Sequence, residues 1–279
     1  MVEKLKHKLR GLWAILAFDN WPVILFGRLF DGNSGFVIYR EKGLDILVDR
    51  LGGDENGTRM CIASDMYRKY LPSFALSEPA NVLDLGANGG GFPLMLRIEE
   101  IEMALAVCVE MNPLTYLRLQ LNLTTNLRSS AVAINAAVCG MPQDSNILLK
   151  PSRGSTGESM YNNRADSSTS HVSVRTTTFQ CLCDKYFKNQ VVDICKIDIE
   201  GAEYELFEST PDDVVRRIRY LIIEFHDSSK TPALMRRIAD LGFVDITLER
   251  SRRARSTTEV RAFLGPGTIP VSGPDYFAT

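Results

Sequence analysis

Three short polar segments of the chain each end an apolar run, and their residue types could bind a cofactor and move a proton. The first follows Val82-Leu83 and reads Asp84-Leu-Gly-Ala-Asn88-Gly-Gly-Gly. Glycines let a backbone turn sharply and approach a ligand closely. The turn from the first strand into the first helix is also where doubly wound sheets bind nucleotides. We therefore predict a cofactor site built from Asp84, Gly86, Ala87, Asn88, Gly90 and Phe92.

Asp84 and Asn88 indicate which cofactor this turn suits. A dinucleotide fingerprint, Gly-x-Gly-x-x-Gly, would require a glycine where the chain has Asn88. The carboxylate of Asp84 would repel a pyrophosphate, but it would attract the α-ammonium group of S-adenosylmethionine. That cofactor carries no phosphate, and its sulfonium is a second positive charge. We therefore predict S-adenosylmethionine as the cofactor.

The second segment begins at Glu110, twenty residues beyond Gly90, which is the spacing of a β-α-β unit. An acidic group at the end of the second strand can accept hydrogen bonds from both ribose hydroxyls. The predicted cofactor site therefore includes Glu110 and the two residues that follow it, Met111 and Asn112.

Asn135 and Ala136 end the third apolar run, near the place where the adenine would lie. The amide of Asn135 could hydrogen-bond to the adenine edge. Amides are also common at the ends of strands, so an ordinary structural role is an equal alternative. Both residues are included in the predicted cofactor site.

The third segment is Lys196-Ile-Asp198-Ile-Glu200, at the end of an apolar run. Alternation along a strand places these three charged side chains on one side. Charges in a central strand are costly to bury without a partner or a function. We expect Asp198 to meet the methionine end of the cofactor or the acceptor hydroxyl, with Glu200 and Glu203 lining the mouth as substrate residues. A purely structural ion pair with Lys196 is the alternative.

His226 ends a further apolar run, Ile223-Glu224-Phe-His226. The ordinary pKa of histidine is near neutrality, so His226 is the predicted general base, with Asp198 and Glu224 as the other catalytic residues. Carboxylate and imidazole groups also suit Mg²⁺ or Mn²⁺, and these three residues could gather such an ion. We favour a site without a metal.

The elements that must position these residues follow an alternating strand and helix pattern from residue 81 onward, which is typical of a mostly parallel sheet. The last two predicted strands are joined by a loop too short for a crossover helix, so they must pair antiparallel. The seven predicted strands cover residues 81–85, 105–110, 132–138, 193–199, 220–226, 243–249 and 259–264. A parallel sheet that ends in an antiparallel hairpin is the class I, Rossmann-like methyltransferase plan.

We expect two parts in the chain. Residues 1–75 form an N-terminal subdomain with a helix and a hairpin at 36–39 and 44–48, and residues 76–279 form the α/β domain. Residues 151–170 are rich in Ser, Gly, Asn and Arg and match no regular element. Loops of this length in compact domains are usually functional or disordered, and we favour a loop that covers the substrate site.

Taken together, these motifs resemble the FkbM family of methyltransferases. The resemblance rests on Val82-Leu-Asp-Leu-Gly-Ala-Asn-Gly-Gly, on Glu110-Met-Asn-Pro with Asn122 and Asn126, on Lys196-Ile-Asp-Ile-Glu-Gly-Ala-Glu, and on Leu221-Ile-Ile-Glu-Phe-His. Gly89 and Gly91 depart from it, since the family more often has an apolar and an aromatic residue there, and Met111 replaces a frequent proline.

The resemblance implies S-adenosylmethionine-dependent O-methylation, often of sugar hydroxyls in polysaccharides, glycolipids or secondary metabolites. Two other readings of the residues stay open. One is a nicotinamide-dependent oxidoreductase, which the failed fingerprint and Asp84 disfavour. The other is a non-catalytic component of a glycan assembly that keeps the fold; intact cofactor motifs with polar strand ends disfavour it.

Composition limits the partners. The chain has 32 Lys and Arg against 34 Asp and Glu, so it lacks the basic excess of a nucleic-acid-binding protein, and we predict no nucleic-acid partner. None of the six cysteines lies in a Cys-x-x-Cys pair, which argues against a zinc site and for reduced thiols in a cytoplasmic protein. The acceptor is expected to be a small molecule or a glycan.

Residues 4–26 could touch a membrane surface. Lys4, Lys6, Lys8 and Arg10 precede the apolar run 12–18, and Trp21 and Phe26 follow it. The run is too short to span a bilayer, but a basic amphipathic stretch with aromatic residues can lie on an anionic surface. A helix that packs its apolar face on the domain is the favoured alternative.

Overall fold

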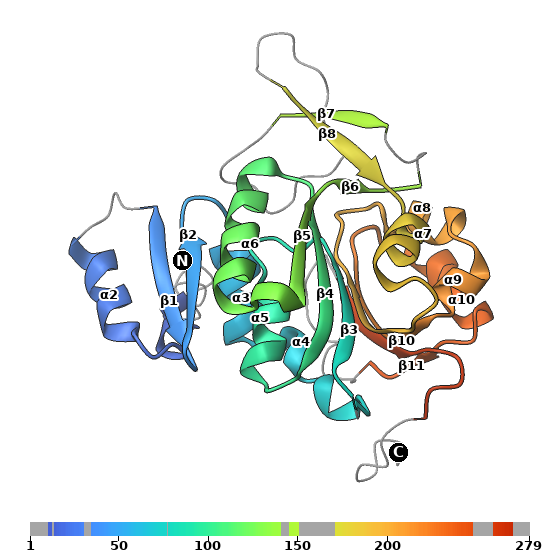
Figure 1. Ribbon diagram of the computed structural model, residues 1–279, viewed down its shortest axis with the longest axis horizontal. Helices are drawn as coiled ribbons and strands as arrows, with labels where there is room; N and C mark the ends of the chain where they lie inside the picture. The colour runs from blue at the N-terminus through green and yellow to red at the C-terminus, as the bar shows by residue number, and fades with distance from the viewer. Residues whose placement is uncertain are drawn as a thin grey trace.

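The computed structural model describes residues 11–12, 14–30, 35–76, 78–140, 145–150, 171–247 and 259–269. Its centre is a seven-stranded sheet with the order β11-β12-β10-β9-β3-β4-β5 (Figure 1). The strands are β3 (Ala80–Leu85), β4 (Met103–Glu110), β5 (Ala131–Asn135), β9 (Val192–Ile197), β10 (Ile218–Phe225), β11 (Val244–Asp245) and β12 (Glu259–Leu264).

Every neighbouring pair from β10 to β5 is parallel, whereas β12 pairs antiparallel with both β10 and β11. This confirms the predicted class I methyltransferase fold. The last predicted strand pair exists, but β11 is shorter than predicted, and residues 248–258 lie outside the described residues.

The central strands are apolar on both faces because helices cover both faces. One face packs Val82, Ala106 and Ile194 against α5 (Gly91–Ile98) and α6 (Pro113–Asn126). The other packs the alternate residues of these strands against α7 (Phe179–Leu182), α8 (Glu203–Ser209) and α10 (Thr231–Asp240). Figure 1 shows α5 and α6 on one side of the strands, and α8, α9 (Asp212–Val215) and α10 on the other.

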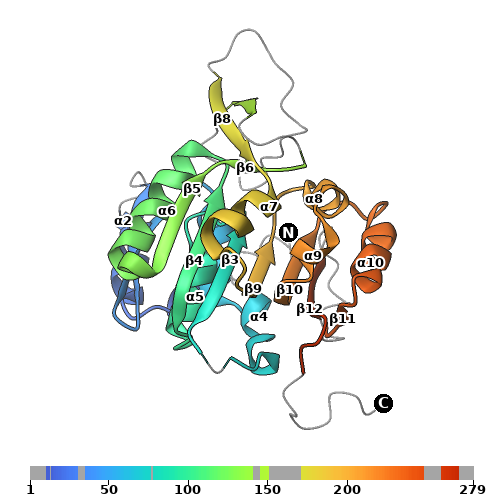
Figure 2. The same cartoon turned by 45° about the vertical axis from the view of Figure 1, so that its right-hand side comes forward.

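A second sheet of three strands, β6-β8-β7, was not predicted. Its strands are β6 (Ala137–Val138), β7 (Asn146–Leu149) and β8 (Val172–Thr177). The sequence predicted one strand over 132–138, but the chain leaves the central sheet after β5 and then pairs with β8 instead. Figure 2 shows this small sheet beyond the end of the central sheet where β5 passes into β6. The predicted substrate-covering loop 151–170 lies outside the described residues.

The N-terminal segment contains α2 (Trp21–Phe30) and the predicted hairpin, formed by β1 (Phe36–Glu41) and β2 (Leu44–Asp49). The two turn residues Lys42 and Gly43 both have positive φ, as a two-residue hairpin turn requires. A short π-helix, η1 (Glu55–Arg59), and the helices α3 (Met60–Ala63) and α4 (Asp65–Arg68) follow. Side chains of this segment share one core with α5 and α6, although the predicted boundary at residue 75 remains a prediction.

Each of the six cysteines is a free thiol, and all but Cys181 are buried. Within the described segments, no helix has both the length and the apolar character that crossing a bilayer requires.

Candidate active site

A cavity opens at the carboxyl ends of β3, β4, β9 and β10, where the sequence predicted the site. Eight of the predicted cofactor residues line it: Gly86, Ala87, Asn88, Phe92, Glu110, Met111, Asn112 and Ala136. So do three of the predicted catalytic and substrate residues: Asp198, Glu200 and Glu224. The structure therefore brings the three polar segments of the sequence together around one space.

The glycine turn after β3 touches the turn after β9. Gly86 has a φ of 77°, and a Cβ placed on it would lie 1.7 Å from the backbone oxygen of Asp198. The amide of Asp198 in turn donates a hydrogen bond to Leu85. Only glycine fits at residue 86, because any side chain would push these two turns apart.

Glu110 is held in place by two backbone amides. Its Oε2 accepts a hydrogen bond from the Asn88 amide at 3.0 Å, and its Oε1 accepts one from the Asn112 amide at 2.7 Å. A carboxylate oxygen can accept more than one hydrogen bond, so both oxygens keep the capacity to accept ribose hydroxyls. The contact to Asn88 also links the ends of β3 and β4.

Asp84 is not placed as predicted. Its side chain is fully buried and does not line the cavity, and its Oδ1 accepts a hydrogen bond from Lys196 Nζ at 3.1 Å. The nearby lysine neutralises the charge that was expected to meet the cofactor's α-ammonium group. The prediction that Asp84 contacts the cofactor directly is therefore wrong. Of this pair, Lys196 is the side chain that lines the cavity.

Gly90 and Asn135 also lie outside the cavity lining. Gly90 has a φ of 89° and precedes α5, with a Cβ position 3.1 Å from Leu119. The amide of Asn135 donates hydrogen bonds to the backbone oxygens of Glu110 and Met111, each at 2.9 Å. The structural alternative therefore holds for Asn135, which fixes the segment that carries Glu110 and does not face an adenine.

Lys196 forms the ion pair that the sequence left as an alternative. Its Nζ contacts Asp84, donates to the backbone oxygen of Gly86 at 3.0 Å, and lies 3.5 Å from Asp198 Oδ2. Burial would lower the pKa of this ammonium, but the two carboxylates outweigh burial and raise it above its ordinary value. The lysine thereby fixes the glycine turn and one oxygen of Asp198.

The N-terminal segment supplies part of the cavity wall, which sequence reasoning missed. The lining residues from this segment are Asn56, Gly57, Thr58, Cys61, Met66 and Tyr67. One feature of the sequence pointed to this wall: Gly89 and Gly91 stand where the family more often has larger residues. A Cβ on Gly89 would lie 2.4 Å from Thr58 Oγ1, and one on Gly91 would lie 2.7 Å from the Thr58 backbone oxygen. These two glycines leave room for the segment to pack directly on the cofactor turn.

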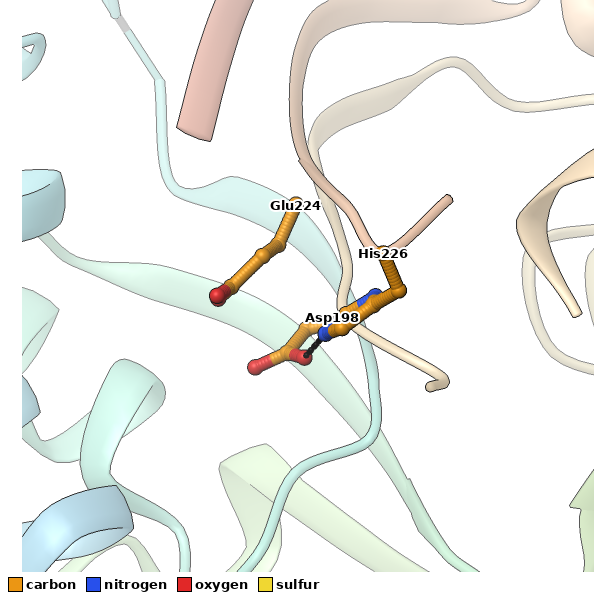
Figure 3. A group of neighbouring side chains, drawn as sticks. All are labelled: Asp198, Glu224 and His226. Atoms are coloured by element: carbon orange, nitrogen blue, oxygen red, sulfur yellow. Dashed lines mark ion pairs between the residues drawn. The ribbon is translucent and has the colours of Figure 1, made fainter. Parts of the chain in front are cut away.

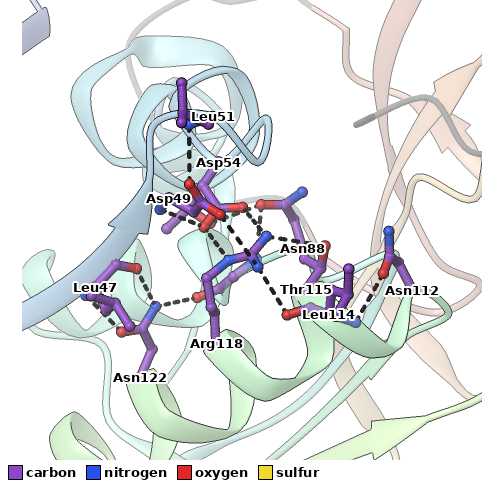
Figure 4. Close-up of polar contacts among 12 residues, drawn as sticks. Leu47, Asp49, Leu51, Asp54, Asn88, Asn112, Leu114, Thr115, Arg118 and Asn122 are labelled. Atoms are coloured by element: carbon purple, nitrogen blue, oxygen red, sulfur yellow. Dashed lines mark hydrogen bonds and ion pairs between the residues drawn. The ribbon is translucent and has the colours of Figure 1, made fainter. Parts of the chain in front are cut away.

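Buried polar contacts fasten this segment to α6 (Figure 4). Arg118 donates to both carboxylate oxygens of the fully buried Asp54, at 2.6 and 2.8 Å. Asn122 exchanges hydrogen bonds with the backbone of Leu47 and also donates to Gly89. Such paired, desolvated contacts hold the segment in one position, so its lining residues are part of a rigid wall.

Charged side chains gather beside the cavity, where Asp198, Glu224 and His226 lie close together (Figure 3). His226 does not line the cavity itself. Its Nε2 lies 3.5 Å from Asp198 Oδ1 and 3.5 Å from Glu200 Oε2, and its Nδ1 lies 2.7 Å from Glu203 Oε1. Glu203, predicted to line the mouth, is instead fully buried behind His226.

With this geometry in place, sequence comparison gives the family. A sequence model described as the Methyltransferase FkbM domain matches residues 84–245, which is more than half of the chain. The chain belongs to the FkbM methyltransferase family. The match begins at Asp84, so the cavity wall formed by Thr58 and Tyr67 lies outside the matched region.

Two solved structures are similar to this FkbM methyltransferase. Methyltransferase FkbM from Methylobacillus flagellatus KT is 13% identical, with a TM-score of 0.48 over 71% of this chain and 46% of that chain. Trm5b from Pyrococcus abyssi is 13% identical, with a TM-score of 0.46 over 83% of this chain and 56% of that chain. The chain thus spans about half the length of each. No curated protein matches the sequence.

In this FkbM methyltransferase three carboxylates lie within 3.5 Å of the His226 ring and favour its protonated form. Burial opposes its charged form, but the hydrogen bond and charge of Glu203, with Glu200 and Asp198, outweigh burial and raise the pKa of His226 to about 9. Burial also raises the pKa of Glu200, to about 7, although His226 lowers it. The surrounding carboxylates thus favour the protonated imidazole, which argues against His226 as the base at neutral pH, and its catalytic role stays a prediction.

The raised pKa of His226 predicts a pH-dependent stability. A folded pKa of about 9 against an ordinary 6.5 stabilises the fold fully below pH 6.5, and the stabilisation is lost as pH rises through 9. We expect the free energy of unfolding to fall by roughly 2 kcal/mol over that interval, after discounting for solvent screening. Urea unfolding in EDTA at several pH values measures it. His226→Gln should flatten the fall, and an equal fall in both proteins would contradict the assignment.

Proposed function

We propose that the chain is an S-adenosylmethionine-dependent O-methyltransferase that acts on a hydroxyl of a sugar, a glycan or a related metabolite. The observation that carries the proposal is the arrangement of one cavity. Its lining includes a glycine turn and Glu110, and also the three carboxylates of Asp198, Glu200 and Glu224. The glycine turn and Glu110 suit a nucleoside, and the three carboxylates suit positive charge and hydroxyl groups.

The residues present fit this cofactor. Glu110 offers two fixed acceptors for ribose hydroxyls, while Phe92, Ala136 and Val138 give apolar surface for a base. The net negative charge of the carboxylates gathered around His226 would attract the positively charged cofactor. When bound, S-adenosylmethionine supplies an electrophilic methyl group. The chain's own task is to align an acceptor oxygen with it and to exclude water.

The acceptor is inferred to be a hydroxyl compound. Carboxylates accept hydrogen bonds and donate none, so Asp198, Glu200 and Glu224 can orient several hydroxyl groups of one acceptor. The same charges would repel a phosphodiester backbone, so no nucleic-acid acceptor is proposed. Glu200 lines the cavity beside His226 and is the proposed acceptor of the hydroxyl proton. The family resemblance supports a sugar-like acceptor.

Calorimetric titration tests the cofactor. The wild-type chain should bind S-adenosylmethionine and should not bind NADH. Glu110→Ala removes two fixed acceptors and should weaken binding roughly 10- to 100-fold. Glu99→Ala is the control, since Glu99 pairs with Arg68 and does not line the cavity. Tight NADH binding, or equal affinity in the Glu110 variant, would reject the assignment.

Activity is tested with glycans and lipids from cells with and without the protein, by mass spectrometry for products heavier by one methylene unit. A chain that binds the cofactor but leaves no such product in glycans, lipids or small metabolites would favour the non-catalytic alternative.

We further propose that α2 contacts an anionic membrane surface. Only Ile24 of this helix is buried, whereas Val23, Phe26, Leu29 and Phe30 are 63–73% exposed. Figure 1 shows α2 at the margin of the molecule, next to β1 and away from the central sheet. Apolar and aromatic side chains in a segment rich in basic residues are typical of helices that lie in a lipid interface. The basic residues 4, 6, 8 and 10 and Trp13 lie outside the described residues, and they precede this helix in the sequence.

Vesicle flotation tests this contact. The chain should float with vesicles that contain phosphatidylglycerol and less with neutral phosphatidylcholine vesicles. Phe26→Ser with Phe30→Ser should abolish flotation, and Leu148→Ser, at an exposed residue of β7, should not. If the double variant instead turns a wild-type dimer into a monomer without an effect on flotation, the face binds a second copy and the membrane proposal fails.

A further inference from the structure

We propose that Asp198, Glu224 and His226 form a divalent-cation site that holds the acceptor through two adjacent oxygen atoms. The inference departs from the metal-free site that the sequence favoured. It rests on the proposed function, because it names how the acceptor hydroxyl is held and activated. The three residues come from the carboxyl ends of β9 and β10, beside the cavity described above.

The spacing of the three side chains suits one ion. One ligand atom from each residue lies within 4.8 Å of the other two. Figure 3 shows the His226 ring against the Asp198 carboxylate, with the Glu224 side chain beside them. Opposite ligands of an octahedral ion with bonds of about 2.1 Å stand about 4.2 Å apart. Asp198 Oδ1 and His226 Nε2 are 3.5 Å apart, close to the spacing of adjacent ligands. The carboxylate of Glu224 completes the group, since it lies within 4.8 Å of both other ligand atoms.

Neighbouring groups already orient two of the ligands. The buried Glu203 carboxylate binds His226 Nδ1 at 2.7 Å, so Nε2 is the nitrogen that faces the other ligands. Histidines that bind metals usually donate their second ring N–H to a carboxylate in this way. Tyr67 and Lys196 contact Asp198 Oδ2, at 3.4 and 3.5 Å, which leaves Oδ1 directed toward His226.

The local charge favours an added cation. Three carboxylates lie within 3.5 Å of the imidazole, from Asp198, Glu200 and Glu203, and that of Glu224 lies within 4.8 Å. The nearest lysine, Lys196, is shared between Asp198 and the buried Asp84. A divalent ion that takes the place of the Nε2 proton would balance these charges, and two carboxylates with one imidazole suit Mn²⁺ or Mg²⁺.

Such an ion narrows the acceptor class. An octahedral ion with three protein ligands keeps positions for two oxygens of one acceptor, as in a vicinal diol or a hydroxyl next to a carboxylate. The ion would lower the pKa of the bound hydroxyl. With ion and cofactor bound, the acceptor hydroxyl would give its proton to Glu200, while its oxygen would bond to the methyl carbon as the carbon–sulfur bond of the cofactor breaks.

Mn²⁺ binding tests the site without turnover. The metal-free full-length chain, with S-adenosylhomocysteine present, is titrated with Mn²⁺, and free Mn²⁺ is followed by electron paramagnetic resonance. We expect one bound ion, with affinity at least 10-fold lower in Asp198→Asn and in Glu224→Gln. Glu203→Gln should weaken binding about 10- to 100-fold by releasing the imidazole. Glu99→Gln is the matched control and should bind as the wild type does.

Absence of Mn²⁺ binding, or binding that Asp198→Asn and Glu224→Gln leave unchanged, would overturn the site. Titration of each protein with S-adenosylhomocysteine shows that it is folded and keeps the two proposals apart. Cofactor binding without Mn²⁺ binding rejects only the cation site. Mn²⁺ binding that depends on Asp198 in a chain that binds no cofactor rejects the proposed function and keeps the cation site.

Discussion

Gly86→Ala is expected to abolish cofactor binding and methyl transfer, with at least a 100-fold loss of each. The added methyl group would stand 1.7 Å from the Asp198 backbone oxygen, at a φ of 77° that side chains rarely adopt. The turn after β3 and the turn after β9 would have to separate. Because one turn faces the cofactor and the other carries Asp198, both halves of the site would move. Calorimetry with S-adenosylmethionine and a methyl-transfer assay measure the two effects.

Gly43→Ala is the matched control for backbone strain. Gly43 also has a positive φ, of 79°, but nothing lies within 4 Å of its Cβ position. The Gly43→Ala substitution should lower the free energy of unfolding by about 1 kcal/mol and leave cofactor binding unchanged. Normal cofactor affinity in a folded Gly86→Ala chain would show that the two turns can separate freely, and the rigid site described above would be wrong.

Lys196→Met is expected to lower the free energy of unfolding by about 3–5 kcal/mol at pH 7, because it leaves the buried Asp84 carboxylate without its partner. Burial already raises the pKa of Asp84, and loss of the lysine would raise it further. Because the folded state of the variant would hold the Asp84 proton more tightly than the wild type does, the variant loses stability as pH rises and regains it as pH falls. The deficit should therefore shrink by up to about 1.4 kcal/mol for each unit as pH falls from the Asp84 pKa of the variant toward the lower Asp84 pKa of the wild type.

Asp84→Asn combined with Lys196→Met should recover most of this loss, since the buried charge is then removed with its partner. Arg40→Met is the surface control. Its pair with Asp45 is more than half exposed on both sides, so the expected change stays below about 1 kcal/mol. Urea unfolding of the four proteins measures these differences. An Asp84 and Lys196 double variant no more stable than Lys196→Met would show that the lysine acts through Gly86 or Asp198 instead.

The cofactor half of the site was largely predictable because its signals are local. A glycine turn after a strand and an acidic residue one β-α-β unit later occupy fixed places in any parallel sheet. Eight of eleven predicted cofactor residues accordingly line the cavity. The exceptions, Asp84, Gly90 and Asn135, are of types that also serve structure, and the sequence does not distinguish the two uses.

The acceptor half was only partly predictable because its properties depend on contacts between distant segments. Glu203 and His226 are separated by 23 residues, yet their contact sets which ring nitrogen faces Asp198 and contributes to the pKa of the imidazole. Thr58 lies outside every motif that the sequence offered, and it reached the cavity through the packing of η1 on Gly89 and Gly91. The two glycines marked the place, but nothing in the sequence named the segment that fills it.

By itself, the sequence determined the alternating strands and helices, the antiparallel final pair and the turn at Gly86. These features depend on the spacing of apolar residues and on the backbone freedom of glycine, which act within a few residues. The tertiary structure decided which charges neutralise one another. Parallel register sets Asp84 beside Lys196, where the lysine removes that carboxylate from the chemistry of the site. Asp198, two residues further on, lies past the end of the strand and faces the cavity. Such pairings depend on distances across the sheet, which no local pattern encodes.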